Sequence, residues 1–295
     1  MKMTRDNFGS LLTPVHKRIA WNEYNEIPEQ YSKLCDVEKM NAKTETEQRL
    51  GGFGAWGTNT EGNTINEDSF GEADDVSFTY SRYDKGYSLT WELTLDDLYG
   101  VMKGLGKGGS AQALGKGLRV AKELCFATVV NGGFTNTGYD ATSLFSNSHS
   151  LASGGTDDNL TTGGVTDSGV KTAITLMRTQ KDEAGLKIQA VAKQIWAAAN
   201  KEWDVYTVLR STGVAGELSN DKNVLPSLTP VIMDYLTDGY WGLRDTSFEN
   251  LKFKNRHAPV FDSQPIPKTV DYFMFGIALF CAGYRDYRGL VGSAG

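Results

Sequence analysis

The chain has 295 residues, of which 40% are hydrophobic and 11% aromatic. This apolar fraction can form a core, so the composition excludes a wholly disordered protein. The length suffices for two domains or for one elongated chain with two lobes. A net charge of −6 argues against a protein whose main task is to bind phosphates, because such binding needs clustered Lys and Arg side chains.

Two further patterns narrow the class of protein. The three cysteines, Cys35, Cys125 and Cys281, are far apart and form no C-x-x-C pair, so we expect reduced, buried thiols. The N-terminus lacks the apolar stretch of a secretory signal. The longest apolar run, residues 272 to 284, is shorter than the about 20 residues that a membrane-spanning helix needs, so we expect no membrane partner.

The first quarter of the chain predicts two extended segments, each of which would lie against another protein surface. Residues 1 to 44 are polar and show no sustained helical or strand period, which is typical of an arm. Residues 45 to 76 are rich in glycine and carry four isolated apolar side chains, Phe53, Trp56, Ile65 and Phe70. A hairpin of this length would reach about 50 Å at about 3.3 Å per residue. Because an isolated ribbon is marginal in water, an ordered one needs a partner surface, and a disordered loop is the alternative.

The next segment shows clear periodicity. Apolar and polar residues alternate over 76–81 and again over 87–94, which predicts an antiparallel hairpin with its turn at 82–86. Residues 94–97 predict a helix start, because the Thr94 hydroxyl can cap the helix and Asp96 and Asp97 place acids in its first turn. Its apolar spacing continues to Thr128 and is interrupted by glycines at 104–109. Gly132 and Gly133 predict its end.

The second half mixes helices and strands. A polar loop over 132–168 comes first. The periodicity then predicts helices at 168–183 and 201–211 and strands at 187–199, 230–236, 240–243 and 273–284. These elements together predict an α+β chain with two lobes.

The sequence contains no strong nucleotide-binding, metal-binding or catalytic motif. A G-x-G-x-x-G match at 104–109 interrupts a helix instead of following a strand, so it does not indicate a dinucleotide site. The histidines, His16, His149 and His257, have no metal-ligand spacing. Ser148 and His149 are neighbours in sequence, but no G-x-S-x-G elbow occurs. We therefore assign no catalytic residue, no metal site and no cofactor.

The order of landmarks resembles that of the major head subunits of tailed bacteriophages, most closely the Mu-like prophage group. The resemblance spans about residues 15 to 292. Its landmarks are the glycine-rich excursion, Gly86 to Leu98 before the long helix, Ser143 to His149, Ile188 to Ser211, and Tyr284 to Gly289. The chain departs from the group in two ways. Its long helix has more glycines, at 104–109, and the segment before residue 200 is not proline-rich.

The resemblance implies an HK97-type capsid fold. It assigns the N-terminal arm to 1–44, the extended E-loop hairpin to 45–76, the peripheral domain with its long spine helix to 77–185, the axial domain to 186–269, and a return to the peripheral domain to 270–295.

The resemblance also implies a structural function without enzyme activity. Such a chain self-assembles as pentamers and hexamers into an icosahedral shell that encloses phage DNA, with scaffolding and portal proteins as partners. Assembly would take place in the cytoplasm of the host bacterium and yield the virion capsid. The expected subunit-contact residues are Phe53, Trp56, Ile65 and Phe70. The alternatives are an encapsulin-type nanocompartment shell, a β-rich hydrolase, and a tail or baseplate component.

Overall fold

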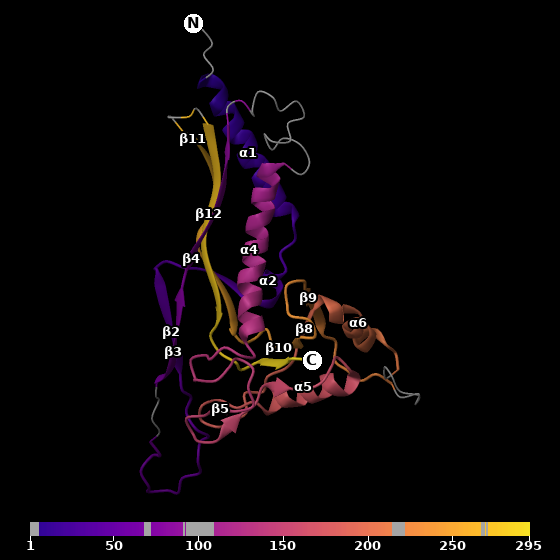
Figure 1. The fold of residues 1–295 in the computed structure, drawn as a ribbon. Coiled ribbons are helices and arrows are strands. Elements are labelled where there is room, and N and C mark those ends of the chain that lie inside the picture. The colour runs from indigo at the N-terminus through magenta and orange to yellow at the C-terminus, as the bar shows by residue number, and fades with distance from the viewer. Residues whose placement is uncertain are drawn as a thin grey trace.

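The computed structural model describes residues 6–67, 72–90, 92, 109–213, 222–266, 269 and 271–295. The molecule is elongated: a narrow column of long strands and helices stands on a wider base, and a two-stranded ribbon projects beside them (Figure 1). In the described part of the chain, no helix has the length and apolar character needed to cross a membrane.

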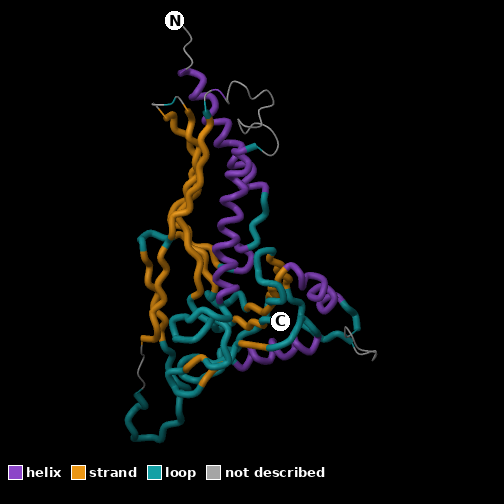
Figure 2. The backbone as a smooth tube through the Cα atoms, in the orientation of Figure 1, coloured by secondary structure: helices purple, strands orange, loops and turns teal. Residues whose placement is uncertain are grey.

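The column is built on a four-stranded sheet. In spatial order its strands are β1 (Asp36–Lys39), β11 (Leu251–Ile266), β12 (Asp271–Tyr284) and β4 (Ser81–Leu89). β1 runs parallel to β11, and the other neighbours are antiparallel. Two long helices, α1 (Asp6–Glu26) and α4 (Ser110–Gly132), pack on each other and on the sheet, and Figure 2 shows them alongside the long strands.

The helices of the column cross closely because of one glycine. A Cβ atom on Gly115 would lie 2.2 Å from the carbonyl oxygen of Ala20, so only glycine allows this approach. One turn further along α4, the guanidinium group of Arg119 donates to the carbonyl oxygen of Tyr24 at 3.0 and 2.7 Å. Our expectation that residues 1–44 lack periodic structure was therefore wrong for α1, which Arg119 and Gly115 hold against the spine.

The base is a five-stranded sheet flanked by two helices. In spatial order the strands are β7 (Leu160–Thr161), β13 (Leu290–Ser293), β10 (Trp241–Arg244), β8 (Gln194–Ala198) and β9 (Thr229–Met233). The helices are α5 (Asp167–Thr179) and α6 (Glu202–Arg210), the latter preceded by a 3₁₀ turn, η1 (Ala199–Lys201). Ile195 and Ala197 of β8 pack in the cluster with α5 and α6, whereas Trp196 and Ala198 face the end of α4.

The ribbon consists of β2 (Thr44–Leu50) and β3 (Glu72–Thr79), which pair antiparallel. The smaller elements are α2 (Tyr31–Leu34), β5 (His149–Ser150) and β6 (Thr156–Asp157). The predicted hairpin over 76–94 was wrong, because β3 pairs with β2 and β4 pairs with β12. Gly86, which we read as part of a turn, lies inside β4, where a Cβ atom would meet the ring of Phe273 at 2.5 Å.

Most other predicted elements are present with bounds that differ from the prediction. α5, α6, β8, β9, β10 and β12 fall within or beside the predicted segments, and α4 ends at Gly132 as expected. β11 was not predicted. The expected start of the long helix at Thr94 and most of its glycine interruption lie outside the described residues.

Candidate subunit-contact surface

The ribbon carries a loop at its far end, residues 51–67, which we call the tip loop. Polar contacts shape it: the side-chain amide of Asn59 donates to the carbonyl oxygen of Thr64 at 2.7 Å, and Asn63 N–H donates to that of Thr60 at 3.2 Å. Gly62 has a φ of 91°, which favours glycine at this turn. The tip loop extends past the base in Figure 1, and most of its residues are exposed to solvent.

The tip loop presents large apolar side chains to that solvent. Trp56 is 98% exposed, Ile65 86% and Phe53 54%. The fourth predicted contact residue, Phe70, lies outside the described residues. Full burial of one such side chain is worth about 1.5–3 kcal/mol, and clustered exposed apolar groups mark interaction surfaces. The exposed apolar side chains of the tip loop are thus typical of a protein–protein contact surface.

The root of the ribbon is held to the column by charges. Glu45, Glu47 and Arg49 alternate along β2, so they share one face. On β11, Lys252 and Lys254 have side chains only 4% exposed. Lys252 Nζ lies 3.0 Å from Glu47 and 2.8 Å from Glu38 of β1, and Lys254 Nζ pairs with Glu47 and with Glu45 at 3.3 Å.

These contacts shift the pKa values of Lys252, Lys254 and Glu47. Burial alone would lower the pKa of Lys252 and of Lys254, but hydrogen bonds and charges from the glutamates outweigh it, so the pKa of each lysine is raised. Burial likewise would raise the pKa of Glu47, but Lys254 and Lys252 hold it below its ordinary value. All three groups are therefore charged near neutral pH.

A second ionic contact fixes the end of β2 nearest the tip loop. The guanidinium group of Arg49 lies 2.9 Å from Glu183 and 3.5 Å from Asp286, and it stacks over the Tyr139 ring at 4.4 Å. Arg288 pairs with the same Glu183 at 2.8 Å. The ribbon is therefore attached by one face to the column and the base, while the tip loop extends beyond them.

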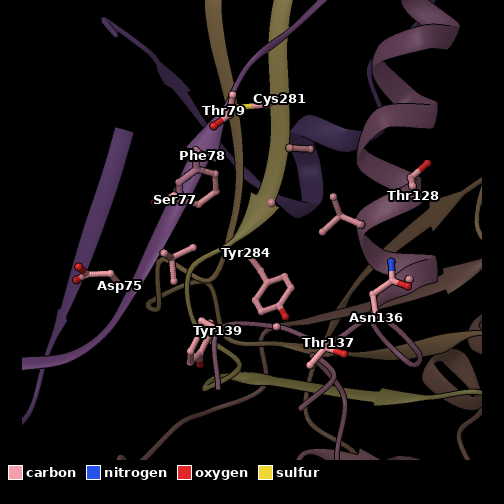
Figure 3. Close-up of a pocket in the computed structure, with 17 residues that line it drawn as sticks. Asp75, Ser77, Phe78, Thr79, Thr128, Asn136, Thr137, Tyr139, Cys281 and Tyr284 are labelled. Carbon is pink, nitrogen blue, oxygen red and sulfur yellow. The ribbon is translucent and has the colours of Figure 1, made fainter. Parts of the chain in front are cut away.

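A groove opens where the ribbon meets the column (Figure 3). It has a volume of about 530 Å³ and lies between β3, the end of α4 and β12. Asp75 is the only carboxylate among its lining residues, which include no His, Lys or Arg. Burial raises the pKa of the Cys281 thiol to about 11 and that of Tyr284 to about 12, so both are protonated at neutral pH. The groove offers no acid–base pair for catalysis.

The Ser148–His149 neighbours do not form a catalytic pair. Both ring nitrogens of His149 are engaged: Nδ1 lies 2.5 Å from Asp140 and 3.1 Å from Thr142, and Nε2 lies 3.1 Å from Asn159. The ring also stacks on Tyr287 at 3.7 Å. The Ser148 hydroxyl contacts Ser146 instead, at 3.2 Å. His149 therefore has a packing role in the base. The described residues also contain no His, Cys, Asp and Glu cluster that could hold a metal ion.

One exposed residue escaped the sequence analysis. Trp203 on α6 is 78% exposed. Val205 and Val208 form the buried stripe of this helix, and Trp203 lies off that stripe. The phase of the helix was thus a signal that could have identified Trp203 as an exposed apolar side chain.

Comparisons with known proteins address the fold. No protein-family model matches the sequence, and no curated protein matches it either. Solved structures do match. The capsid of the cyanophage P-SCSP1u is 9% identical with a TM-score of 0.60, over 90% of this chain and 88% of that chain. The capsid of an empty GTA particle is 11% identical with a TM-score of 0.57, over 90% and 88%.

A third solved structure extends the likeness beyond phages. A virus-like particle from Pyrococcus furiosus is 7% identical with a TM-score of 0.56, over 95% of this chain and 98% of that chain. In each case the likeness covers about nine tenths or more of both chains, so it concerns the fold of the chain as a whole and not a single lobe. The chain therefore has the α+β fold of phage capsid proteins, the HK97-like fold.

Proposed function

We propose that this chain is the major capsid protein of a tailed bacteriophage, which self-assembles into a closed icosahedral shell around DNA. The observation that carries the proposal is the likeness of fold to capsid subunits over about nine tenths of both chains. The role is structural, and the functional surfaces are those through which copies of the chain bind one another.

The tip loop supports this function because its chemistry suits a neighbouring copy. Trp56 and Ile65 lie almost fully in solvent on a ribbon whose root is fixed by buried ion pairs. A fixed root limits the conformational entropy lost when the tip loop binds, which favours association. Many modest contacts of this kind, repeated around a closed symmetric shell, give a stable assembly.

The finer assignments follow from the sequence landmarks. We propose that 1–44 act as the arm, 45–76 as the E-loop, 77–185 with 270–295 as the peripheral domain and 186–269 as the axial domain. Pentamers and hexamers would form in the host cytoplasm with scaffolding and portal proteins, and the landmarks favour the Mu-like group.

Expression of the chain with its scaffold partner, followed by light scattering and negative-stain electron microscopy, tests the proposal. We expect pentamers, hexamers or closed shells. The double variant Phe53→Ser/Trp56→Ser should remain folded by circular dichroism but form no shells, whereas Thr58→Ser in the same loop should assemble normally. Normal shells from the double variant would contradict the role of the tip loop, and a persistent monomer of the parent chain would contradict the function.

The contents and shape of the assembly distinguish the related alternatives. Shells that enclose DNA fit a phage head, and shells that enclose a protein cargo fit an encapsulin-type nanocompartment. Tubes or small rings would instead indicate a tail or baseplate component.

A further inference from the structure

The hydrogen-bond partners of His149 determine the charge of its ring. The side chain is only 1% exposed. Nδ1 lies 2.5 Å from the Asp140 carboxylate, and Nε2 lies 3.1 Å from the side-chain oxygen of Asn159. A neutral imidazole has one donor nitrogen and one acceptor nitrogen, whereas an imidazolium ion has two donors. The ring is therefore charged if both of its neighbours can only accept.

The backbone around Asn159 fixes the orientation of its amide. The amide oxygen accepts from the Ser146 N–H at 2.8 Å, and the amide nitrogen donates to the carbonyl oxygen of Leu144 at 2.8 Å. An exchange of these two atoms would place donor against donor and acceptor against acceptor. The atom that faces His149 is thus an oxygen, and Nε2 must carry a hydrogen.

The Asp140 carboxylate requires a hydrogen on Nδ1 as well. Burial alone would raise the pKa of Asp140, but hydrogen bonds from His149 and Thr142 hold it below its ordinary value, so this carboxylate is an acceptor. The Thr142 hydroxyl lies 3.1 Å from Nδ1. If that hydroxyl donated to a bare Nδ1, the nitrogen lone pair would face a carboxylate oxygen at 2.5 Å. A protonated Nδ1 avoids this repulsion.

Three further titratable groups lie around His149. Tyr287 stacks on the ring at 3.7 Å, and burial raises the pKa of its hydroxyl, which therefore stays neutral. Asp157 lies opposite His149 in the β5–β6 pair, and burial raises the pKa of its carboxyl. Arg288 lies over the other ring, that of Tyr287, and pairs with two acids of its own. Asp140 is thus the charged hydrogen-bond partner of the histidine, and Tyr287 offers the face of its ring to a positive charge.

Asp140 belongs to a strained turn, residues 137–143, whose two ends pair with each other. Ala141 has a φ of 59°, a left-handed conformation that alanine rarely adopts and that persists only where its surroundings enforce it. Asp140 also accepts from the Thr142 N–H at 3.2 Å, which closes the backbone around Ala141. Tyr139 of the strained turn lines the groove beside the ribbon (Figure 3).

We propose that His149 is held as an imidazolium ion and that its second proton keeps the strained turn closed. Without that proton, Asp140 loses its charged partner, and the strain at Ala141 favours an open turn with a changed groove wall. An exposed histidine loses its proton between about pH 5 and 8. The closed turn thus binds one proton more than an open turn at higher pH, so closure weakens as the pH rises. This inference concerns the subunit and does not depend on the shell function.

Nitrogen NMR of the full chain with labelled histidine measures the charge of the ring directly. The chain has three histidines, and the variants His16→Gln and His257→Gln identify the signals of His149 by elimination. Near neutral pH we expect both ring nitrogens of His149 to give the chemical shift of a protonated nitrogen. One bare ring nitrogen in His149 at that pH overturns the inference.

Hydrogen exchange of the strained turn, corrected for the intrinsic effect of pH, measures its opening. The opening constant should rise at least tenfold between about pH 7 and 9, because one proton allows up to tenfold per pH unit. The ribbon residues 44–50, whose ionic anchor does not include His149, should keep constant protection over this range.

Asp140→Asn separates the proton from the shape of the site. The new amide can donate to Nδ1 of a neutral His149 and still accept from the Thr142 N–H, so the turn should stay closed and its opening should lose the dependence on pH. Asp158→Asn is the matched control: that carboxylate accepts from the Leu160 N–H at 2.8 Å, and the variant should keep the pH dependence of the parent chain. Opening of the parent turn that is constant with pH, or equally pH-dependent in Asp140→Asn, overturns the inference.

Discussion

Lys254 and Glu47 form an ion pair that ties the projecting ribbon to the column. Lys254 belongs to β11 and Glu47 to β2, more than 200 positions apart in the chain, and the lysine side chain is only 4% exposed. Lys252 reaches the same carboxylate at 3.0 Å. Glu47 thus bridges two buried ammonium groups, which Glu38 and Glu45 also contact, so the direction of the ribbon depends on charge pairing.

Removal of Glu47 should therefore destabilise the subunit far more than a neighbouring change on the same strand. Glu47→Ala leaves two buried lysines short of a counter-charge, and we expect a loss of about 2–3 kcal/mol in the free energy of unfolding. Thr46→Ala affects the opposite face of β2, where the hydroxyl contacts that of Ser77 at 3.0 Å, and should cost less than about 1 kcal/mol. Urea unfolding of both variants measures the difference, and equal losses would contradict the ionic anchor.

The anchor should also respond to pH in a defined window. The pKa of Glu47 lies below its ordinary value of 4.5, so its stabilisation is present above that pH and is lost as pH falls through the lowered pKa. The pKa values of Lys252 and Lys254 lie above 10.5, so their contribution is present below that pH and is lost only above it. The ribbon is thus anchored from about pH 5 to 10.

Hydrogen exchange of residues 44–50, corrected for the intrinsic effect of pH on exchange, measures this anchor. Protection should be constant from about pH 5 to 9 and should decrease below about pH 4, before the core of the base opens. Loss of protection in the ribbon and in β8 at the same pH would show that the anchor is not a separate unit.

The sequence predicted the elements whose signal is local. α5 and α6 have regular apolar spacing, and α5 begins at an N-cap, where the Thr166 hydroxyl accepts from Gly169 N–H at 3.1 Å. α4 stops at a pair of glycines. Such signals need no knowledge of distant partners, because spacing and capping act within a few residues.

The sequence did not predict partners between distant strands. Alternation identified the end of β3 and the last three residues of β4 as strand, but alternation does not specify which strand lies beside which. Gly86 looked like a turn residue, whereas it makes room for the ring of Phe273 on the neighbouring strand. The length and glycine-rich composition of 45–76, and not the alternation, led to the projecting hairpin, and the resemblance to capsid subunits then identified it as an E-loop.

The strand signal of β11 is short and interrupted. Leu251 and Phe253 alternate with Lys252 and Lys254 over only four residues, and Pro259 and Pro265 weaken the strand signal further along. The glutamates that make those lysines tolerable come from β1 and β2, far earlier in the chain. Likewise, α1 buries a stripe of His16, Ala20 and Tyr24, of which only the last is a large side chain. Hydrophobic periodicity cannot detect such faces.

His149 should prove structural and Ser148 dispensable. His149→Ala removes the hydrogen bonds to Asp140 and Asn159 and the stacking on Tyr287, so we expect a loss of about 3 kcal/mol. Ser148→Ala removes an exposed hydroxyl and should change stability by less than about 0.5 kcal/mol. Thermal unfolding of the two variants tests this contrast. A stable His149→Ala variant would contradict the packing role and reopen the hydrolase alternative.

Two glycines on α4 should respond oppositely to the same substitution. Gly115→Ala places a methyl group 2.2 Å from the carbonyl oxygen of Ala20, which forces α1 away from the spine, and we expect a loss of about 3 kcal/mol. Gly117→Ala, two residues later, meets no atom within 4 Å and should gain about 1 kcal/mol from helix propensity. Urea unfolding of the isolated subunit measures both. Because helix propensity favours alanine equally at the two sites, a gain at position 115 would mean that α1 does not pack against α4 in solution.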